Sequence, residues 1–331
     1  MTNQELLISY LNKLTEDEIS SLLDAAALML KAEEPAAKPP CPYCGSGRVI
    51  CYGHACRKQR FLCKDCGHTF VPTTNTIMAN SRFPASVWKE MIADTLHGSA
   101  IDYSARRLGL HHQAAFDMRH KILLALQELP EVTGVCLEDV SEVDETFVLD
   151  CYKGRPMDAA AGRNPRRHGA KAEKRGISSE YLCICTGIQR RGEALAATVN
   201  RAKPSAKELL DVFEGHIADG TLVLCDGLRS YHALPGIADC TVKDCSDREA
   251  EGSCFYHLNT VNGFHSFIKK RYDFYRGVAS KYINRYNALF SATYRNAETM
   301  IRRLTEAVLA VTGTNYYHSN KDVRTFRLLA I

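Results

Sequence analysis

The chain has 331 residues, of which 42 are Lys or Arg, 38 are Asp or Glu and 14 are Cys. Its length predicts about two domains with small additions, and 45% apolar with 24% charged residues exclude a disordered or collagen-like chain. No apolar run is long enough to cross a membrane, and no secretory signal opens the sequence, so we expect a cytoplasmic protein. Because stable disulfides are rare in that compartment, metal binding is the first explanation for the cysteines.

The net charge of +4 is unevenly distributed. Residues 41–130 carry 11 basic and 6 acidic side chains, residues 153–176 carry 8 and 2, and residues 269–285 carry 6 and 1. Basic segments within an otherwise acidic remainder predict a polyanionic partner and a separate site built from carboxylates. Solvated loops and helix faces are the alternative explanation for any one of these segments.

Residues 1–34 are expected to form one or two helices, because leucines recur there at helical spacing. A Pro-rich linker, EEPAAKPP at 33–40, separates them from a Cys-rich segment at 41–72. That segment contains two CxxC pairs, Cys41 with Cys44 and Cys63 with Cys66, with 18 residues between the pairs and a Gly after each. This spacing predicts a zinc ribbon with one structural Zn²⁺ held by four thiolates. Basic side chains between the pairs are candidate DNA contacts: Arg57, Lys58 and Arg60.

Residues 83–130 have helical periodicity and contain a helix-turn-helix-like pattern. The pattern consists of Ile101–Leu110 followed by His111–Arg119, with Gly109 at the sharp turn, and the second helix is expected to begin near His111 or His112. In the DNA-binding version of this motif the second helix enters the major groove. The residues expected to contact DNA are His112, Gln113 and Arg119. Helix pairs of this kind also occur in proteins that never touch DNA.

Strand and helix patterns alternate from about residue 135 onward, which predicts an α/β domain. Asp144 lies within a strand-like run at 136–149 and shares a face with Glu142 and Thr146. Asp226 follows a short buried strand at 221–225, at the end where α/β sheets place ligand sites. Two Asp on adjacent strands can share a divalent cation, although either alone can be a turn former.

A third element of the predicted site is the helical stretch that follows residue 258. Asn262 and Lys269 are seven residues apart and share a helix face, with His265 on the same side. A polar metal ligand and a Lys two turns later would suit a substrate phosphate lying along this helix. An amphipathic helix with a basic solvent face is the alternative.

Together these motifs resemble the DDE-type insertion-sequence transposases with an N-terminal zinc ribbon, the ISXO2-like group. The resemblance covers residues 41 to about 290. It rests on CPYC and CKDCGHTF, EVDETF around Asp144, LCDGLRSY around Asp226, HLNTVNGFHSFIKK around Asn262, and RGVASKYINRYN at 276–287. It implies an RNase H-like catalytic core at 135–300, a mixed sheet flanked by helices, followed by a helical tail at 301–331. Asn262 stands where many relatives have Glu.

The resemblance implies a transposase that cuts the ends of its element and joins 3′-OH ends to target DNA. Asp144, Asp226 and Asn262 would hold two Mg²⁺ or Mn²⁺ ions, and Lys269 would position a phosphate. Double-stranded DNA, as terminal inverted repeats and target, is the expected partner, bound by a homodimer or larger synaptic complex at a prokaryotic-type nucleoid. Further DNA contacts are expected from two basic segments: Arg166 and Arg167, and Lys270 and Arg271.

Two rival functions remain open at this point. The neutral Asn262 is compatible with a zinc-ribbon DNA-binding regulator whose RNase H-like domain no longer catalyses. A nuclease of the same fold without joining activity is the second rival. Either Glu142 or His265 is a candidate to assist the metal site.

Overall fold

The computed structural model describes residue 15 and residues 38–55, 58–153, 172–246, 255–295, 298–311 and 318–325. The chain divides into two compact units, Met1–Pro72 and Thr73–Ile331, and each is described by itself. The predicted N-terminal helices at 1–34 lie outside the described residues, apart from Thr15, and so do Arg57, Arg166 and Arg167. Within the described part of the chain, no helix combines the length and apolar character needed to cross a membrane.

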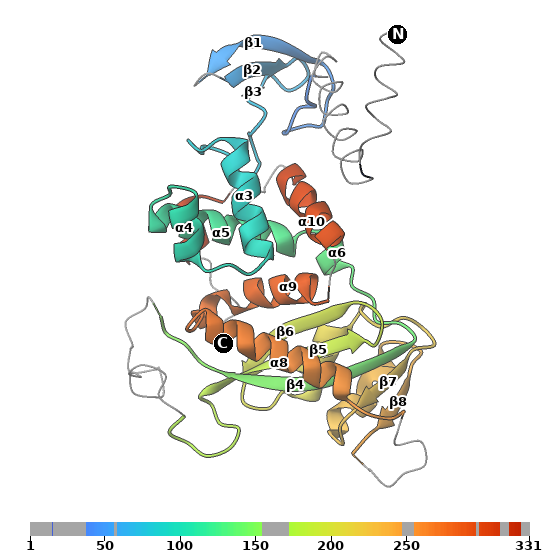
Figure 1. Ribbon diagram of the computed structural model, residues 1–331. Helices are drawn as coiled ribbons and strands as arrows, with labels where there is room; N and C mark the ends of the chain where they lie inside the picture. Colours follow the sequence, from blue (N-terminus) through green and yellow to red (C-terminus); the bar gives the residue numbers. More distant parts are fainter. Residues whose placement is uncertain are drawn as a thin grey trace. The chain divides into compact units, whose positions relative to one another are not determined.

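The first unit contains a small antiparallel sheet of three strands in the order β1-β2-β3 (Figure 1). The strands are β1 (Val49–Ala55), β2 (Lys58–Cys63) and β3 (Thr69–Phe70). Among the described residues of this unit, Val49, Phe61 and Phe70 are buried together with Cys41 and Cys63, and Cys66 packs against them. A core this small rarely stabilises a fold without a staple such as a metal ion.

The second unit is built on a mixed five-stranded sheet, which confirms the predicted α/β class. Its strand order is β6-β5-β4-β7-β8. Strands β4, β5 and β6 pair antiparallel, whereas β7 is parallel to β4 and β8 is parallel to β7. The bounds are β4 (Val140–Leu149), β5 (Tyr181–Gln189), β6 (Ala194–Arg201), β7 (Leu222–Cys225) and β8 (Thr241–Asp244). The longest strand, β4, is therefore central and touches both halves of the sheet.

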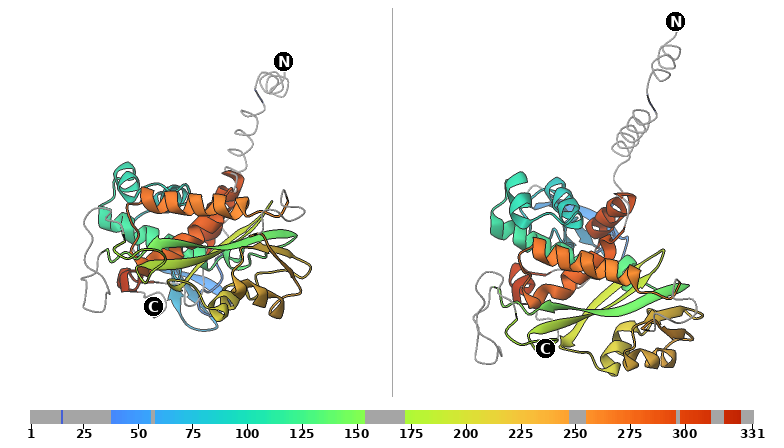
Figure 2. Two further views of the ribbon diagram at one scale, coloured as in Figure 1. Left: turned by 90° about the horizontal axis from the view of Figure 1, so that it is seen from below. Right: turned by 60° about the horizontal axis from the view of Figure 1, so that its bottom comes forward.

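Helices cover both faces of this sheet. On one face, α8 (Asn259–Phe274) crosses β4 and β5 (Figure 2), and α9 (Ile283–Thr293) packs against β6. The other face packs against α7 (Ala206–Phe213) and the 3-10 helix Arg229–Gly236, through a cluster that includes Phe213 and Tyr231. A capping box between Ser205 and Glu208 starts α7, and α8 begins where its periodicity predicted.

Apart from α11, the remaining helices contribute to one apolar core with α8, α9 and the sheet. Among them are the three helices of the helix-turn-helix region. Buried side chains of this core come from segments far apart in sequence, for example Trp88, Ile122, Phe264 and Leu304. The segments distinguished as 83–130, 135–300 and 301–331 therefore have a common hydrophobic core. The helices are α3 (Ala85–Leu96), α4 (Ile101–Arg107), α5 (His112–Gln127), α6 (Pro130–Thr133), α10 (Glu298–Ala310) and α11 (Asn320–Thr325).

A buried carboxylate joins β4 to the start of α8. The Glu142 side chain is fully buried, and its Oε2 accepts the backbone N–H groups of Thr260 at 2.8 Å and Val261 at 3.0 Å. Its Oε1 accepts from Arg190 Nε at 2.8 Å. Since Leu258, at the N-cap of α8, offers no side-chain cap, Glu142 satisfies amides of the first helical turn from another element.

We expect Glu142→Ala to lower the free energy of unfolding of the second unit by about 3–5 kcal/mol. Removal of the carboxylate leaves the Arg190 guanidinium without its ion pair. It also leaves two backbone N–H groups of α8 buried without a hydrogen-bond acceptor. Urea denaturation monitored by circular dichroism measures the change. Glu142→Gln, which retains an acceptor, should cost less. As a matched control, Glu138→Ala at an exposed position should change stability by less than about 0.5 kcal/mol; equal effects at 138 and 142 would contradict this role.

Candidate functional site

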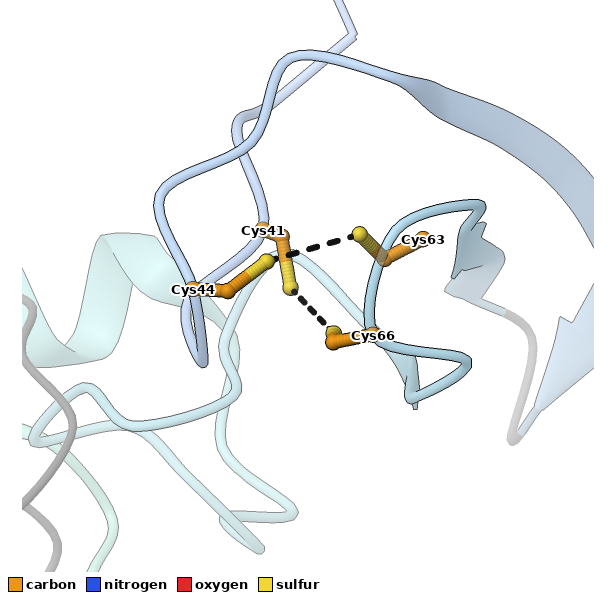
Figure 3. A group of neighbouring side chains, drawn as sticks. All are labelled: Cys41, Cys44, Cys63 and Cys66. Atoms are coloured by element: carbon orange, nitrogen blue, oxygen red, sulfur yellow. Dashed lines mark hydrogen bonds between the residues drawn. The ribbon is translucent and has the colours of Figure 1, made fainter.

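The four predicted zinc ligands converge in the first unit (Figure 3). The Sγ atoms of Cys41 and Cys66 lie 3.5 Å apart, those of Cys44 and Cys63 lie 3.6 Å apart, and all four lie within 4.8 Å of one another. Four sulfurs bound tetrahedrally to Zn²⁺ at about 2.3 Å are separated by about 3.8 Å. The quartet therefore has the donor set and the spacing that a structural zinc ion requires.

The backbone of the two CxxC turns supports this geometry. Gly45 N–H donates to the carbonyl of Cys41 at 2.8 Å, and Gly67 N–H donates to that of Cys63 at 3.0 Å. Both glycines have a φ of 73°, which a residue with a Cβ rarely adopts. Backbone N–H groups of Cys66 and then Asp65 donate to the Cys63 sulfur and lower the pKa of Cys63 to about 6, which favours the thiolate that zinc binds.

Basic and aromatic groups lie together on the ribbon. The Arg60 guanidinium lies 4.9 Å from the ring centroid of Tyr52, which is 47% exposed, and Arg60 Nε donates to the Tyr52 carbonyl at 3.1 Å. Tyr43 and His68 stack with their ring centroids 4.5 Å apart. DNA contact by Lys58 and Arg60 stays a prediction.

The helix-turn-helix geometry forms at the predicted turn. Gly109 has a φ of 63° between α4 and α5, and α5 begins at His112. His112 and Gln113 are exposed in its first turn. His112 Nε2 lies 3.3 Å from Asp102 Oδ1, and Gln113 Nε2 donates to Asp117 Oδ1 at 3.1 Å. Only this N-terminal turn of α5 offers consecutive exposed side chains, so any DNA reading by α5 is restricted to its start.

The prediction that Arg119 contacts DNA is wrong. Arg119 is 1% exposed and lies near Tyr286 of α9, where burial raises the pKa of Tyr286 and the charge of Arg119 partly offsets that increase. The physical reason is tertiary packing. Helix α5 is covered by α3, α9, α10 and α11, so that side chains beyond its first turn face the core on several sides.

The two predicted catalytic aspartates meet at neighbouring strands. In the parallel pair, Glu142 of β4 is opposite Leu224 of β7, and this register places Asp144 beside Asp226, the residue that follows β7. Carboxylate oxygens of Asp144, Asp226 and Glu145 lie within 4.8 Å of one another. Asp226 Oδ1 also accepts the Leu228 N–H at 3.1 Å, which fixes the turn after β7. A three-carboxylate cluster therefore forms at this end of the sheet.

Glu145 was not predicted as a site residue. Alternation along a strand assigns it to the face opposite Asp144, so the pattern that selected Asp144 argued against its neighbour. The available signal was the pair of adjacent carboxylates at 144 and 145 within the strand. The side chain of Glu145 approaches Tyr231, whose hydroxyl lowers the pKa of Glu145 while burial raises it more strongly. That approach falls short of hydrogen-bond geometry, because Glu145 Oε1 and the Tyr231 hydroxyl are both buried without a partner.

Burial is the main cause of the electrostatics at Asp144. It raises the pKa of Asp144 to about 7, and the charges of Glu145 and Asp226 add to the increase. The Glu145 N–H, which donates to Asp144 Oδ1 at 2.8 Å, and the charge of Lys269 act in the opposite direction. Crowded carboxylates with an unpartnered oxygen fit a divalent cation, since oxygen ligands bind Mg²⁺ or Mn²⁺ and the positive charge offsets the repulsion.

Helix α8 brings His265 and Lys269 to the other side of Asp144. His265 Nδ1 lies 3.8 Å from Asp144 Oδ2, and its Nε2 lies 2.7 Å from the Thr186 hydroxyl of β5. Burial, and then the charge of Lys269, lower the pKa of His265 to about 4, so that the ring is neutral at pH 7. Asn262 is exposed on the same side of α8, one turn before His265. Its predicted metal contact stays a prediction.

Other predicted residues have different environments. Both oxygens of Glu142 are already occupied by Arg190 and α8, so that Glu142 positions the helix and does not face the carboxylate cluster. Lys270 is exposed. Arg271 donates to the His97 carbonyl at 3.4 Å and lies over the Phe267 ring, which ties α8 to the end of α3.

Residues 137–296 match the family model of the ISXO2-like transposase domain. A similar protein is the "Uncharacterized protein in transposable element ISH50" of Halobacterium salinarum, which is 23% identical over 257 residues, covering 76% of this chain and 83% of the relative. A solved structure described as a pre-cleavage Mos1 transpososome covers 69% of this chain and 77% of its own at 11% identity, with a TM-score of 0.22. The matched range contains Asp144, Glu145 and Asp226 and the whole of α8, the helix that faces them.

We expect Cys63→Ser to reduce the zinc content of the purified protein from about one ion per chain to nearly none, because a structural zinc site requires its full set of ligands. Elemental analysis by mass spectrometry measures the stoichiometry. Cys51→Ser is the matched control: Cys51 is an exposed free thiol of the same sheet, outside the quartet, and its loss should leave the zinc in place. A full complement of zinc in the Cys63 variant would contradict the assignment.

The raised pKa of Asp144 predicts a pH dependence of stability. An unfolded Asp ionises near pH 4 and the folded one near pH 7, so the stability contribution of Asp144 is present below pH 4 and is lost as the pH rises through 7. Between pH 5 and pH 8, wild type should therefore lose roughly 2–3 kcal/mol relative to Asp144→Asn, which has no carboxyl group to titrate.

Urea unfolding of both proteins at the two pH values, without added divalent cation, tests this difference. Added Mg²⁺ at pH 8 should restore wild type and have little effect on the variant. An identical gap between wild type and variant at pH 5 and pH 8 would show that Asp144 titrates normally.

Proposed function

We propose that the protein is a DNA transposase that cuts the ends of its insertion sequence and joins the free 3′-OH ends to target DNA. The observation that carries the proposal is the meeting of Asp144 and Asp226, with Glu145, in one partly buried cluster that faces Lys269 of α8. This cluster lies inside an ISXO2-like transposase domain. Carboxylates gathered in this way suit metal-assisted phosphoryl transfer better than a purely structural site.

In the proposed mechanism, Asp144, Asp226 and Asn262 bind cations, and Lys269 binds a DNA phosphate. Asp144 lies between Asp226 and α8, so it would be shared by two cations, with Asp226 on one and Asn262 on the other. When bound, two Mg²⁺ or Mn²⁺ ions supply activation of the attacking water or 3′-OH and stabilise the leaving oxygen. Lys269 follows Asn262 by two helical turns and would hold a neighbouring phosphate in position.

DNA binding is proposed for the basic surfaces of both units. Arg57, Lys58 and Arg60 of the ribbon and the exposed first turn of α5, with His112 and Gln113, would contact the terminal inverted repeats. Arg166 and Arg167 in the basic segment, and Lys270 and Arg271 on α8, would contact DNA near the cleavage site. Contacts with phosphates would make the affinity strongly dependent on salt. Because two ends must be brought together, a homodimer or larger synaptic complex in the cytoplasm, on nucleoid DNA, is the proposed working form.

One observation favours a second candidate. Asn262 is neutral, and an amide oxygen binds Mg²⁺ more weakly than a carboxylate. A DNA-binding regulator with an inactive domain would bind the element ends without nicking them, whatever the metal. A nuclease without joining activity would nick the ends and leave an added 3′-OH donor unjoined. One assay with labelled end DNA, Mg²⁺ and target DNA separates the three functions.

In that assay, wild type should produce joined product, and Asp144→Ala should lose it by roughly a thousandfold or more, because the variant removes a carboxylate shared by both proposed cations. The Asp144 variant should still bind the end DNA. Asp211→Asn, an exposed carboxylate on α7, is the matched control and should join at the wild-type rate. Full activity of Asp144→Ala would exclude the proposed chemistry.

A further inference from the structure

A chain of two hydrogen bonds fixes the proton position on His265. The Thr186 hydroxyl oxygen lies 2.7 Å from the Asp144 carbonyl oxygen, which can only accept a hydrogen bond. The single proton of the hydroxyl is therefore donated to that carbonyl. His265 Nε2 lies 2.7 Å from the same hydroxyl oxygen and must therefore donate to it. The neutral imidazole thus carries its proton on Nε2, and Nδ1 keeps a free lone pair.

The free nitrogen points at the carboxylate of the proposed site. His265 Nδ1 lies 3.8 Å from Asp144 Oδ2, in a position where the histidine is only 6% exposed. Two electron-rich atoms that face each other in a buried place repel unless a cation or a proton lies between them. Metal-binding histidines have this arrangement: one nitrogen is free toward the ion, and the N–H of the other is held by a hydrogen-bond acceptor.

His265 is separate from the three-carboxylate cluster. Among the described residues, the group of possible ligands around Asp144 contains Glu145 and Asp226 but not His265. The carboxylate of Asp144 is therefore flanked on two sides, by acidic groups at the β7 side and by a neutral nitrogen at the α8 side. Asn262 lies one turn from His265 on that same helix, and ligands three residues apart can bind one ion.

We propose that His265 supplies a nitrogen ligand to the divalent cation held on the α8 side of Asp144. The inference rests on the metal-dependent function proposed above and adds a ligand to that site. Asn262 and His265, two neutral ligands from successive turns of α8, would then together replace the Glu that many relatives have at the position of Asn262. Thr186 acts as a positioning residue, because its hydroxyl holds the ring in the tautomer that leaves Nδ1 free. A nitrogen donor also shifts the preference of the site from Mg²⁺ toward Mn²⁺.

The direct experiment uses Mn²⁺ bound to the full-length protein and detects its ligands by electron spin-echo envelope modulation. Wild type should show the modulation of a directly bound nitrogen. His265→Gln should lose it, since its amide can still donate to Thr186 but has no ring nitrogen for the metal. His232→Gln, an exposed histidine of the 3-10 helix Arg229–Gly236, should keep it. The ratio of joining rates in Mn²⁺ and Mg²⁺ should fall severalfold in His265→Gln only.

Thr186→Val tests the positioning role. It removes the hydroxyl and keeps the shape, so Mn²⁺ affinity should fall by roughly 10–100-fold, whereas the nitrogen modulation should persist at saturating Mn²⁺. Thr186→Ser should restore the affinity.

Three results would overturn the inference. Mn²⁺ binding that depends on Asp144 but gives no nitrogen modulation would remove His265 from the ligands and leave the proposed function intact; a proton between the two side chains would then explain their approach. Modulation that persists in His265→Gln would assign the nitrogen elsewhere. Mn²⁺ binding that is unchanged in Asp144→Asn would contradict both the inference and the two-metal chemistry on which it rests.

Discussion

The alignment of β4 with α8 depends on the buried carboxylate of Glu142. Every proposed catalytic group except Asp226 is carried by one of these two elements, so the site exists only if they keep a fixed register. Apolar contacts of Val261, Phe264 and Ile268 with the sheet are strong but non-directional. Amides of the first turn of α8 donate to Glu142, and His265 one turn later donates to Thr186; these hydrogen bonds define the position of the helix along its own axis.

The same region contains three mutually repelling carboxylates in a partly buried position. Asp144, Glu145 and Asp226 gather where burial penalises charge, and Lys269 compensates only in part. A fold tolerates such a cluster because the surrounding sheet and helices determine its geometry, as they do for other strained functional sites. A cation bound at this cluster would reduce the repulsion and so stabilise the site, which would couple metal binding to local order.

The sequence predicted much of this arrangement and missed parts that depend on tertiary contacts. The cysteine quartet was predictable because four ligands and a fixed spacing leave few alternatives. Asp144 and Asp226 were predictable because strand alternation and strand ends limit where a carboxylate points. Glu145 was missed for the same reason, since its side chain reaches the cluster from the face that alternation assigns to the core. The roles of Glu142 and Arg119 were beyond a local pattern.

Arg119 shows why helical periodicity was not enough. A 3.6-residue period finds one buried face when one side of a helix meets the core. Helix α5 instead meets α9, α10 and α11, which lie more than 150 residues further along the chain, and these contacts cover the faces that the period left free. No pattern within residues 111–127 contains that information.

The continuous core that joins α3, α4 and α5 to α8, α9 and α10 also limits how this protein can be recombined with its relatives. A chimera cut near residue 130 would separate Ile122 from the partners that bury it, and would need matching C-terminal helices from the same donor. The contact boundary at Pro72 has no such cost. Exchange of ribbons at that point would leave the core of the second unit unchanged.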